Sequence, residues 1–266
     1  MSTQALVTAR TAADVRVAVR RWRSEGESVA FVPTMGNLHD GHVSLAALAA
    51  AECDHVVASI FVNPTQFGPS EDFAAYPRTL ADDIARLDAA GTVDLLFAPE
   101  VREIYPFGLE HAVRVALPPL SRELDGASRP GHFEGVASVV CRLLNIVTPD
   151  VLVLGQKDYQ QVTLLRLMIE DLRLPVAVRV GATLREADGL AFASSVVSDT
   201  TALVESKLPQ VSVASTRKVI VVPATKCPSP AGPTGAPVFK PAVPGAAISP
   251  FTRMRRKRAL EAVSSG

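Results

Sequence analysis

The sequence is poor in cysteine, in aromatic residues and in net charge. Its three cysteines, Cys53, Cys141 and Cys227, are widely spaced and form no CxxC pair, which argues against a disulfide framework and against a cysteine-based metal site. We therefore expect reduced thiols and a cytoplasmic protein. Lysine and arginine together number 27, as do aspartate and glutamate, so no overall field attracts nucleic acid or an anionic membrane. Any phosphate site has to be local.

Long apolar runs are also missing. No uncharged apolar run reaches the roughly 18 residues that a membrane span needs, and the first residues include polar side chains and Arg10 instead of an apolar stretch. We expect neither a membrane span nor export. With 266 residues, of which 48% are hydrophobic, the chain is long enough to bury a large core.

Apolar segments of two kinds alternate along the chain up to about residue 180. Short continuous runs, which are typical of buried parallel strands, occur at 28–32, 55–62, 93–97, 151–154 and 176–180. Longer segments with helical spacing of apolar residues occur at 11–25, 41–52, 79–90, 132–147 and 158–172. This alternation predicts an α/β fold with a Rossmann-like, doubly wound parallel sheet. Ligands of such sheets bind beyond the carboxyl ends of the strands.

The pattern weakens after about residue 195. Prolines are interleaved with small residues over 226–250, which excludes a regular helix or a central strand there. A short basic cluster follows at 253–258. We expect the segment 220–266 to be poorly ordered.

The sharpest local signal is the run PTMGNLHDGH at 33–42, between the first of these strands and the helix that follows it. Gly36 and Gly41 allow the backbone to approach a ligand closely, and the helix N-terminus offers unpaired N–H groups to a phosphate. His39 and His42 are spaced so that both imidazoles can face one ligand. A turn with two incidental surface histidines is the alternative, but the position at the end of a strand favours phosphate binding.

Two further strands end in polar residues. The run SIFVNPTQF at 59–67 presents Asn63 and Gln66, whose neutral amides suit a hydroxy acid; the alternative is a polar loop whose amides only cap turns. The run GQKDYQQ at 155–161 offers Lys157 to a phosphate and Asp158 to ribose hydroxyls. Gln161, one turn further along the helix, faces the same ligand-binding edge of the sheet. A charged helix start is the alternative there.

Two other groups are weaker on their own. Asp82 and Asp83 open the helix 79–90, where acidic residues usually complement the helix dipole. One or two carboxylates nevertheless suffice for a divalent ion that bridges phosphates. Arg129 and His132 lie on a loop that leads into the next long helix, where they either meet an anion or face solvent.

The run at 33–42 resembles the HIGH motif of nucleotidyltransferases. Its flanks, together with the blocks at 59–67, 121–150 and 155–161, resemble the pantothenate synthetase (pantoate–β-alanine ligase) family over roughly residues 1–195. The resemblance implies a ligase that uses ATP and Mg²⁺ to join pantoate to β-alanine through a pantoyl adenylate. It also implies a homodimer.

The resemblance carries roles over to individual residues. It implies that charge on the departing phosphates is stabilised by His42, His39 and Lys157. It implies ATP binding by Met35, Gly36, Asn37, Leu38, His39, Asp40, Gly41, His42, Gly155, Gln156, Lys157, Asp158, Leu184, Phe192, Ala193, Ser194 and Ser195. It implies pantoate binding by Gln66 and Gln161, β-alanine binding by Gln66, and a Mg²⁺ ion near Asp82 and Asp83. Arg129 and His132 would belong to the pantoate side of the cleft.

The resemblance ends after the segment LREADGLAFASS at 184–195. Val196 and Val197 follow where the family has an arginine in a loop that closes over the phosphates, so we expect impaired turnover. We predict a Rossmann-like catalytic domain over 1–183. The rest, 184–266, would be a remnant or replacement of the family's C-terminal lid domain, and a frameshifted tail would explain the abrupt change.

Two other functions stay open at this point. Another HIGH-type nucleotidyltransferase would attach a nucleotide to a phosphate ester, although the blocks at 59–67 and 155–161 favour the acid ligase. A non-catalytic remnant that only binds nucleotide or pantoate would agree with the missing arginine. Each of these functions requires the loops that carry His39 and Lys157 to lie together.

Overall fold

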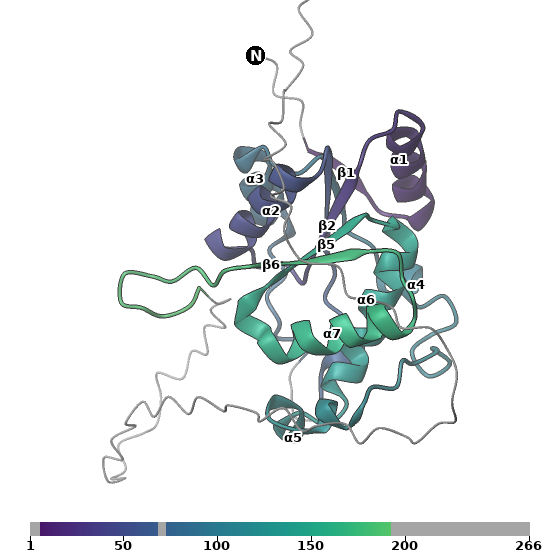
Figure 1. Cartoon of the computed structure of the whole chain (residues 1–266), viewed down its shortest axis with the longest axis vertical. Coiled ribbons are helices and arrows are strands. Elements are labelled where there is room, and N and C mark those ends of the chain that lie inside the picture. Colours follow the sequence, from purple (N-terminus) through teal and green to yellow (C-terminus); the bar gives the residue numbers. More distant parts are fainter. Residues whose placement is uncertain (1–5, 69–72, 193–266) are drawn as a thin grey trace, which may run out of the picture. The chain divides into compact units, whose positions relative to one another are not determined.

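Six parallel strands form one sheet in the computed structural model, which describes residues 6–68 and 73–192 (Figure 1). In chain order the strands are β1 (Val7–Ala9), β2 (Val29–Thr34), β3 (His55–Ile60), β4 (Leu95–Phe97), β5 (Val151–Gly155) and β6 (Ala177–Gly181). They lie in the order β1-β4-β3-β2-β5-β6, and every pairing is parallel. The predicted α/β fold with a doubly wound sheet is confirmed.

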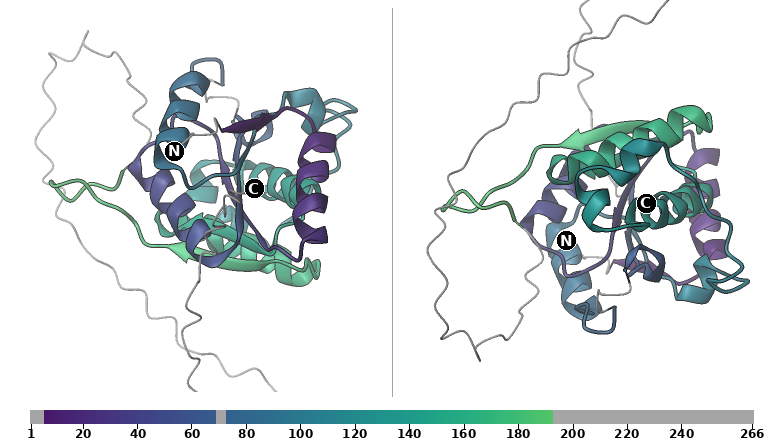
Figure 2. Two further views of the ribbon diagram at one scale, coloured as in Figure 1. Left: turned by 90° about the horizontal axis from the view of Figure 1, so that it is seen from above. Right: turned by 90° about the horizontal axis from the view of Figure 1, so that it is seen from below.

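Helices cover both faces of the sheet (Figure 2). One face packs against α1 (Ala12–Ser24), α6 (His132–Val147) and α7 (Tyr159–Asp171). The other face packs against α2 (Asp40–Glu52) and α3 (Leu80–Ala90). The connections contain the short helices α4 (Val101–Ile104) and α5 (Asp125–Ser128) and the 3-10 turns η1 (Pro64–Gln66), η2 (Pro119–Arg122) and η3 (Gln156–Asp158). Within the described ranges, none of the helices is long and apolar enough to cross a membrane.

Strand β2 shows how the sequence specifies this layering. Successive side chains of a strand point to opposite faces of the sheet. Phe31 is fully buried in the cluster formed with α1, α6 and α7, whereas Ala30 and Val32 pack in the cluster on the α2 side. A strand that is buried on both faces has a continuous apolar sequence, which is why this strand is recognisable from the sequence alone.

The predicted helices and strands match the observed ones within two residues at every end. The sequence does not predict β1, because three residues carry too little pattern to be recognised as a strand. The prediction of poor order for 220–266 falls on residues outside the described ranges. The division at residue 183 also stays a prediction, because most of 184–266 lies outside the described ranges.

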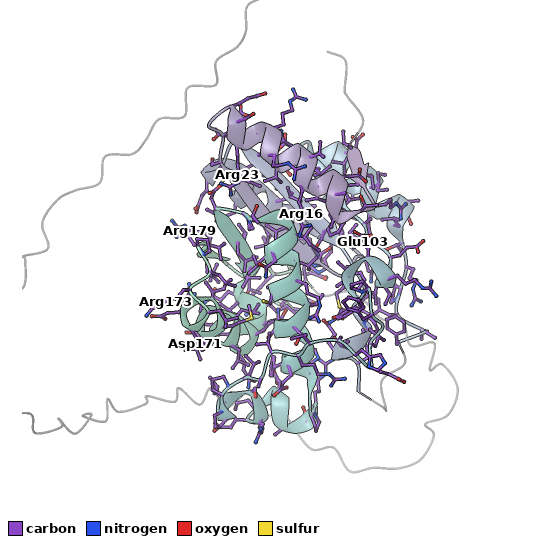
Figure 3. All side chains as sticks on the ribbon, turned by 90° about the vertical axis from the view of Figure 1, so that its right-hand side faces the viewer. Arg16, Arg23, Glu103, Asp171, Arg173 and Arg179 are labelled. Atoms are coloured by element: carbon purple, nitrogen blue, oxygen red, sulfur yellow. The ribbon has the colours of Figure 1, made fainter. Side chains whose placement is uncertain are left out.

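Two arginines of α1, Arg16 and Arg23, are labelled in Figure 3 and bond to the last turn of α6 and to the loop before β5. Arg16 donates to the carbonyl oxygen of Asn145 at 3.5 Å, and Arg23 donates to the carbonyl oxygen of Thr148 and to the Asp150 carboxylate. The other oxygen of Asp150 accepts from the N–H of Val29 at 2.8 Å. This carboxylate therefore links the residue before β5 to the first residue of β2. The arginine contacts are largely exposed, so we expect each to add under about 1 kcal/mol.

We predict that Gly135→Ala destabilises the fold through a clash between α6 and η1. A Cβ atom at Gly135 would lie 2.3 Å from the carbonyl oxygen of Thr65 and 2.8 Å from the Cα atom of Gln66. Both are backbone atoms, so the helix or the turn has to move, at a cost of about 1–3 kcal/mol. Urea unfolding measures this loss. An unhindered Gly→Ala change in a helix adds up to about 1 kcal/mol, so a gain in stability would contradict the prediction.

Candidate active site

The strand order of the sheet reverses between β2 and β5, and ligands of doubly wound sheets bind at such a point. The chain proceeds from β2 to β3 and β4 on one side, and from β5 to β6 on the other. Phe31 pairs with Leu152, so the two neighbouring strands run in step toward the same edge. The loop that carries His39 and the turn that carries Lys157 therefore leave the sheet next to each other, as the sequence analysis requires.

His39 and His42 cap the N-terminus of α2 reciprocally. The Nδ1 atom of His39 accepts from the N–H of Gly41 at 3.1 Å, and the Nδ1 atom of His42 accepts from the N–H of His39 at 3.3 Å. The centres of the two rings are 4.1 Å apart. Because a neutral imidazole that accepts at one nitrogen carries its hydrogen on the other, both rings keep an Nε2–H donor for a ligand.

The surroundings of the two histidines favour the neutral form. Burial lowers the pKa of His42 to about 4, helped by the nearby His39 and by the Lys157 ammonium. Burial also lowers the pKa of His39, again with a contribution from Lys157. Lys157, in the turn after β5, thus lowers the pKa of both histidines in the loop after β2. At neutral pH the cluster consists of two neutral donors and one positive charge.

Close packing around His39 explains the glycine at position 41. A Cβ atom there would lie 2.8 Å from the Cε1 atom of the His39 ring, so a larger residue would displace the imidazole. Phe192 lies against the same ring with centres 6.1 Å apart, and its N–H donates to the carbonyl oxygen of Leu184 at 3.2 Å. The predicted nucleotide residues Leu184 and Phe192 thus belong to a turn beside His39. The predictions for Ala193, Ser194 and Ser195 fall outside the described residues.

Asp83 holds the loop that leads to the histidines. Its buried carboxylate accepts from the N–H groups of Asn37 at 3.0 Å and Leu38 at 2.7 Å, and from the Thr79 hydroxyl at 3.2 Å. Asp83 therefore has a structural role in this loop, and the expectation of a Mg²⁺ ion near Asp82 and Asp83 stays a prediction. The side chain of Leu38 lies in the core, so only its backbone can face a nucleotide.

The other acidic residues near these loops give no protein metal cage. Asp82 is exposed, Asp40 pairs with Arg86 at 2.8 Å, and Asp158 lies 3.3 Å from the Lys157 ammonium. Within residues 6–68 and 73–192, no three His, Cys, Asp or Glu side chains are grouped so as to hold a metal. A magnesium ion here would have to be held mainly by phosphate oxygens.

A pocket of about 300 Å³ brings together the two glutamines that the sequence analysis assigns to pantoate, Gln66 and Gln161. Its mixture of apolar, amide and charged side chains suits a small acid with hydroxyl groups. The lining residues are Met35, Gln66, Phe67, Tyr76, Asp125, Ser128, Arg129, His132, Phe133, Asp158 and Gln161. Met35 and Asp158 come from the histidine loop and the Lys157 turn, so the pocket adjoins both.

Asn63 positions Gln66 instead of lining the pocket itself. It is 1% exposed, and its Nδ2 atom donates to the Gln66 side-chain oxygen at 3.2 Å and to the Gly135 carbonyl oxygen at 3.2 Å. Its Oδ1 atom accepts from the Tyr105 hydroxyl at 2.7 Å and from Thr65. The suggestion that Asn63 offers its amide to a ligand is therefore corrected, because both ends of that amide are already bonded within the protein.

His132 and Arg129 form part of the pocket wall, and His132 is not a solvated loop residue. His132 is 9% exposed, and its Nδ1 atom lies 2.8 Å from the carbonyl oxygen of Gln66. Since a carbonyl only accepts, Nδ1 carries the hydrogen, and Nε2 is left to accept from the Arg129 guanidinium at 3.1 Å. This chain of contacts holds a permanent cation at the pocket that contains Gln66.

A larger hollow of about 540 Å³ lies next to the ends of β3 and β4. It shares Met35 with the smaller pocket, but its lining includes neither His39, His42 nor Lys157 and is mostly apolar. The predicted residues Gly36 and Asp83 also line this hollow, whereas the two histidines, Lys157 and both glutamines lie at the smaller pocket or in the two loops beside it.

Comparisons with known proteins place the chain in one family. Residues 7–200 match the family model described as pantoate-beta-alanine ligase. A pantothenate synthetase from Shewanella baltica is 58% identical over 181 residues, which are 68% of this chain and 64% of that protein. A second, from Shewanella halifaxensis, is 55% identical over 189 residues, covering 71% of this chain and 66% of that protein. The chain thus spans 64% of the length of the first of these relatives.

Two solved structures are also similar. The pantothenate synthetase of Thermus thermophilus has a TM-score of 0.66 and 52% identity, covering 71% of this chain and 66% of that chain. The pantoate-beta-alanine ligase of Francisella tularensis, complexed with beta-gamma ATP and beta-alanine, has a TM-score of 0.67 and 41% identity. That match covers 71% of this chain and 72% of the other.

We predict that Asp83→Asn lowers the free energy of unfolding by about 1–3 kcal/mol in the absence of nucleotide and metal. An asparagine offers one acceptor oxygen where the carboxylate serves two N–H groups, so a buried donor loses its partner. Urea unfolding provides the measurement. Asp82→Asn is the matched control at an exposed site, and we expect a change within about 0.5 kcal/mol. Equal stability of both variants, with a raised Mg²⁺ requirement for activity, would instead favour a metal role for the pair.

A further prediction concerns pH. An unfolded imidazole binds its proton near pH 6.5, whereas the folded His42 does so only near 4. Between these values the unfolded state holds more protons, so the free energy of unfolding falls as the pH falls and the loss ends below about 4. We expect His42 to contribute a loss on the order of 2 kcal/mol between about pH 7 and about pH 4.5, measured by urea unfolding.

The histidine variants identify the source of this pH dependence. His42→Gln removes the titrating ring, so its stability should fall less steeply with acid, whereas His111→Gln at an exposed position should behave like the unchanged protein. If His42→Gln loses stability as steeply as the unchanged protein, other groups cause the effect.

Proposed function

The chain belongs to the pantoate–β-alanine ligase family, and we propose that it joins pantoate to β-alanine with ATP, releasing AMP and pyrophosphate. One observation carries this proposal above the others: the two neutral histidines and Lys157 lie beside the pocket that contains Gln66 and Gln161. A group of phosphate-binding donors next to an acid pocket is what the activation of a carboxylate by ATP requires.

We propose a reaction in two steps. A carboxylate oxygen of pantoate attacks the α-phosphorus of ATP, and the bond to the departing pyrophosphate breaks, which leaves pantoyl adenylate. The amine of β-alanine then attacks the acyl carbon, AMP leaves with the bonding electrons, and the nitrogen loses a proton. No step requires a covalent bond to the protein.

The described residues divide these tasks. The Nε2–H donors of His39 and His42 would stabilise the negative charge that grows on the phosphates as pyrophosphate leaves, with Lys157 as the cation beside them. Gln66 and Gln161 would bind the hydroxyl and carboxylate groups of pantoate, and Gln66 would also contact β-alanine. Nucleotide contacts by the remaining loop residues, from Met35 to Gly41 and from Gly155 to Asp158, belong to the same proposal.

Two further parts of the proposal concern partners. Magnesium would accompany ATP and supply charge neutralisation of its phosphates, with Asp82 as the acidic residue of the predicted pair that is exposed. A homodimer and a cytoplasmic location are the remaining expectations from the family.

The sequence at Ser195–Val196 favours a second candidate, a protein that binds the substrates without turnover. The resemblance to the family implies an arginine in a loop that closes over the phosphates, and this sequence has Val196 and Val197 there, within the range that the family model matches. Loss of one such donor typically costs about 10²–10³ in rate.

The test is pantoate-dependent exchange of labelled pyrophosphate into ATP by the full chain. We expect exchange that requires pantoate, and a fall in its rate of about 10²–10³ in His42→Gln and in Lys157→Met, because each variant removes a donor that acts on the transition state. His111→Gln and Arg166→Met are matched controls at exposed positions, and both should retain the rate.

The outcomes separate the candidates. Exchange with a phosphate ester but not with pantoate would replace the ligase by another nucleotidyltransferase. Binding of ATP and pantoate without any exchange would support the second candidate. Full activity of both site variants would overturn the roles assigned to His42 and Lys157.

A further inference from the structure

Gln160, the second residue of α7, joins this helix to a separate segment of the chain, residues 119–129. Its Oε1 atom accepts from the N–H of Asp125 at 3.1 Å. Its Nε2 atom donates to the carbonyl oxygens of Leu120 at 2.9 Å and Glu123 at 2.8 Å. An amide offers an acceptor and two donors at once, so all three contacts depend on glutamine chemistry at this position.

These bonds hold a backbone turn that is unfavourable by itself. Leu124 has a φ angle of 50°, which a residue with a branched side chain adopts only under constraint. Its side chain is 69% exposed, so packing of that side chain does not supply the constraint. The contacts from Gln160 to Glu123 and Asp125 lie on either side of Leu124 and do supply it.

The segment that Gln160 holds is one wall of the 300 Å³ pocket. Asp125, Ser128 and Arg129 line that pocket, and so does Gln161, the neighbour of Gln160 in α7. Gln160 is absent from the pocket lining. Gln160 therefore connects α7, which carries the predicted pantoate-binding residue Gln161, to the pocket wall at 125–129.

The segment has a second anchor, next to the Leu120 contact. The Ser121 hydroxyl donates to the Glu134 carboxylate of α6 at 3.0 Å. Gly126 packs so closely on the carbonyl of Ser121 that a Cβ atom there would overlap it. The segment is thus compact and attached to α6 on one side and, through Gln160, to α7 on the other.

We propose that Gln160 is a positioning residue, which sets the distance between Gln161 and the pocket wall at 125–129 without touching the substrate. This rests on the proposed function, since it takes pantoate as the molecule in the pocket. Loss of the Gln160 contacts would widen the pocket. Lys157 and Asp158 lie before α7 and are not among the groups that Gln160 bonds. We therefore expect ATP binding to be retained.

The kinetic experiment uses the full chain and the pyrophosphate exchange reaction. We expect Gln160→Leu and Gln160→Glu to raise the KM for pantoate about tenfold while the KM for ATP stays within about twofold. Glutamate keeps the acceptor for Asp125 but cannot donate to the two carbonyls when ionised. Arg166→Leu introduces the same leucine at an exposed position of the same helix and should change neither constant.

Hydrogen exchange gives a readout that needs no activity. The backbone N–H groups of residues 120–129 should exchange about tenfold faster in both Gln160 variants than in the unchanged protein, whereas those in the middle of α6 should be unaffected. Unchanged exchange over 120–129 would show that Gln160 does not hold the segment and would overturn the proposal.

The remaining outcomes are distinct. An unchanged KM for pantoate would overturn the proposal, and so would an equal rise of both KM values with a lower unfolding midpoint, because that is the behaviour of a general structural contact. An unchanged protein that shows no pantoate-dependent exchange would contradict the proposed function and this substrate role together. The hydrogen exchange result would then still decide whether Gln160 fastens the segment.

Discussion

Hydrogen bonding between β2 and β5 is the contact on which the candidate site depends. The two loops that follow these strands are far apart in the sequence, and they meet because the strands are parallel neighbours in a fixed register. The core fixes that register. A slip of β2 by one residue would turn Phe31 toward the α2 side, where alanines such as Ala46 and Ala49 pack, and would leave a void in the α6 cluster. Packing of apolar side chains thus sets the distance between His39 and Lys157.

Local patterns account for the part of the molecule that could be predicted from the sequence. Buried strands have continuous apolar sequences, and the glycine-bearing runs after β2 and β5 mark the ligand edge, so the fold and the two loops follow from short stretches. The roles of Asp83, Asn63 and Gln160 could not be predicted in this way, because their partners lie elsewhere in the chain. One signal was present for Asp83: it lies four residues before Leu87, and both belong to the buried face of α3. An acidic residue on an apolar helix face is usually there to satisfy buried donors.

The electrostatics of the site follow from the same packing. Burial holds His42 neutral, and the nearby Lys157 ammonium adds to this effect, because a second positive charge close to the first would repel it. A neutral ring avoids the cost of burying a charge and still presents an N–H donor. Lys157 remains partly exposed, so its own charge stays solvated until a phosphate replaces water. In the proposed function this arrangement separates two tasks, since the partly buried histidines would direct N–H donors and the exposed lysine would supply charge.

Three side chains that line no part of the acid pocket determine the shape of the site. Asp83 reaches from α3 to the backbone of the histidine loop, Asn63 orients Gln66, and Gln160 reaches from α7 to the segment 119–129. Asp83 and Gln160 bond backbone groups of loops and turns, where no regular ladder satisfies the backbone, whereas Asn63 bonds the Gln66 side chain and the Gly135 carbonyl of α6. Asp83 acts on the nucleotide side and Gln160 on the acid side, and they belong to helices on opposite faces of the sheet. The two supports thus reach the site from different sides, and Met35 of the histidine loop, which lines the acid pocket and contacts Gln66, connects the two halves.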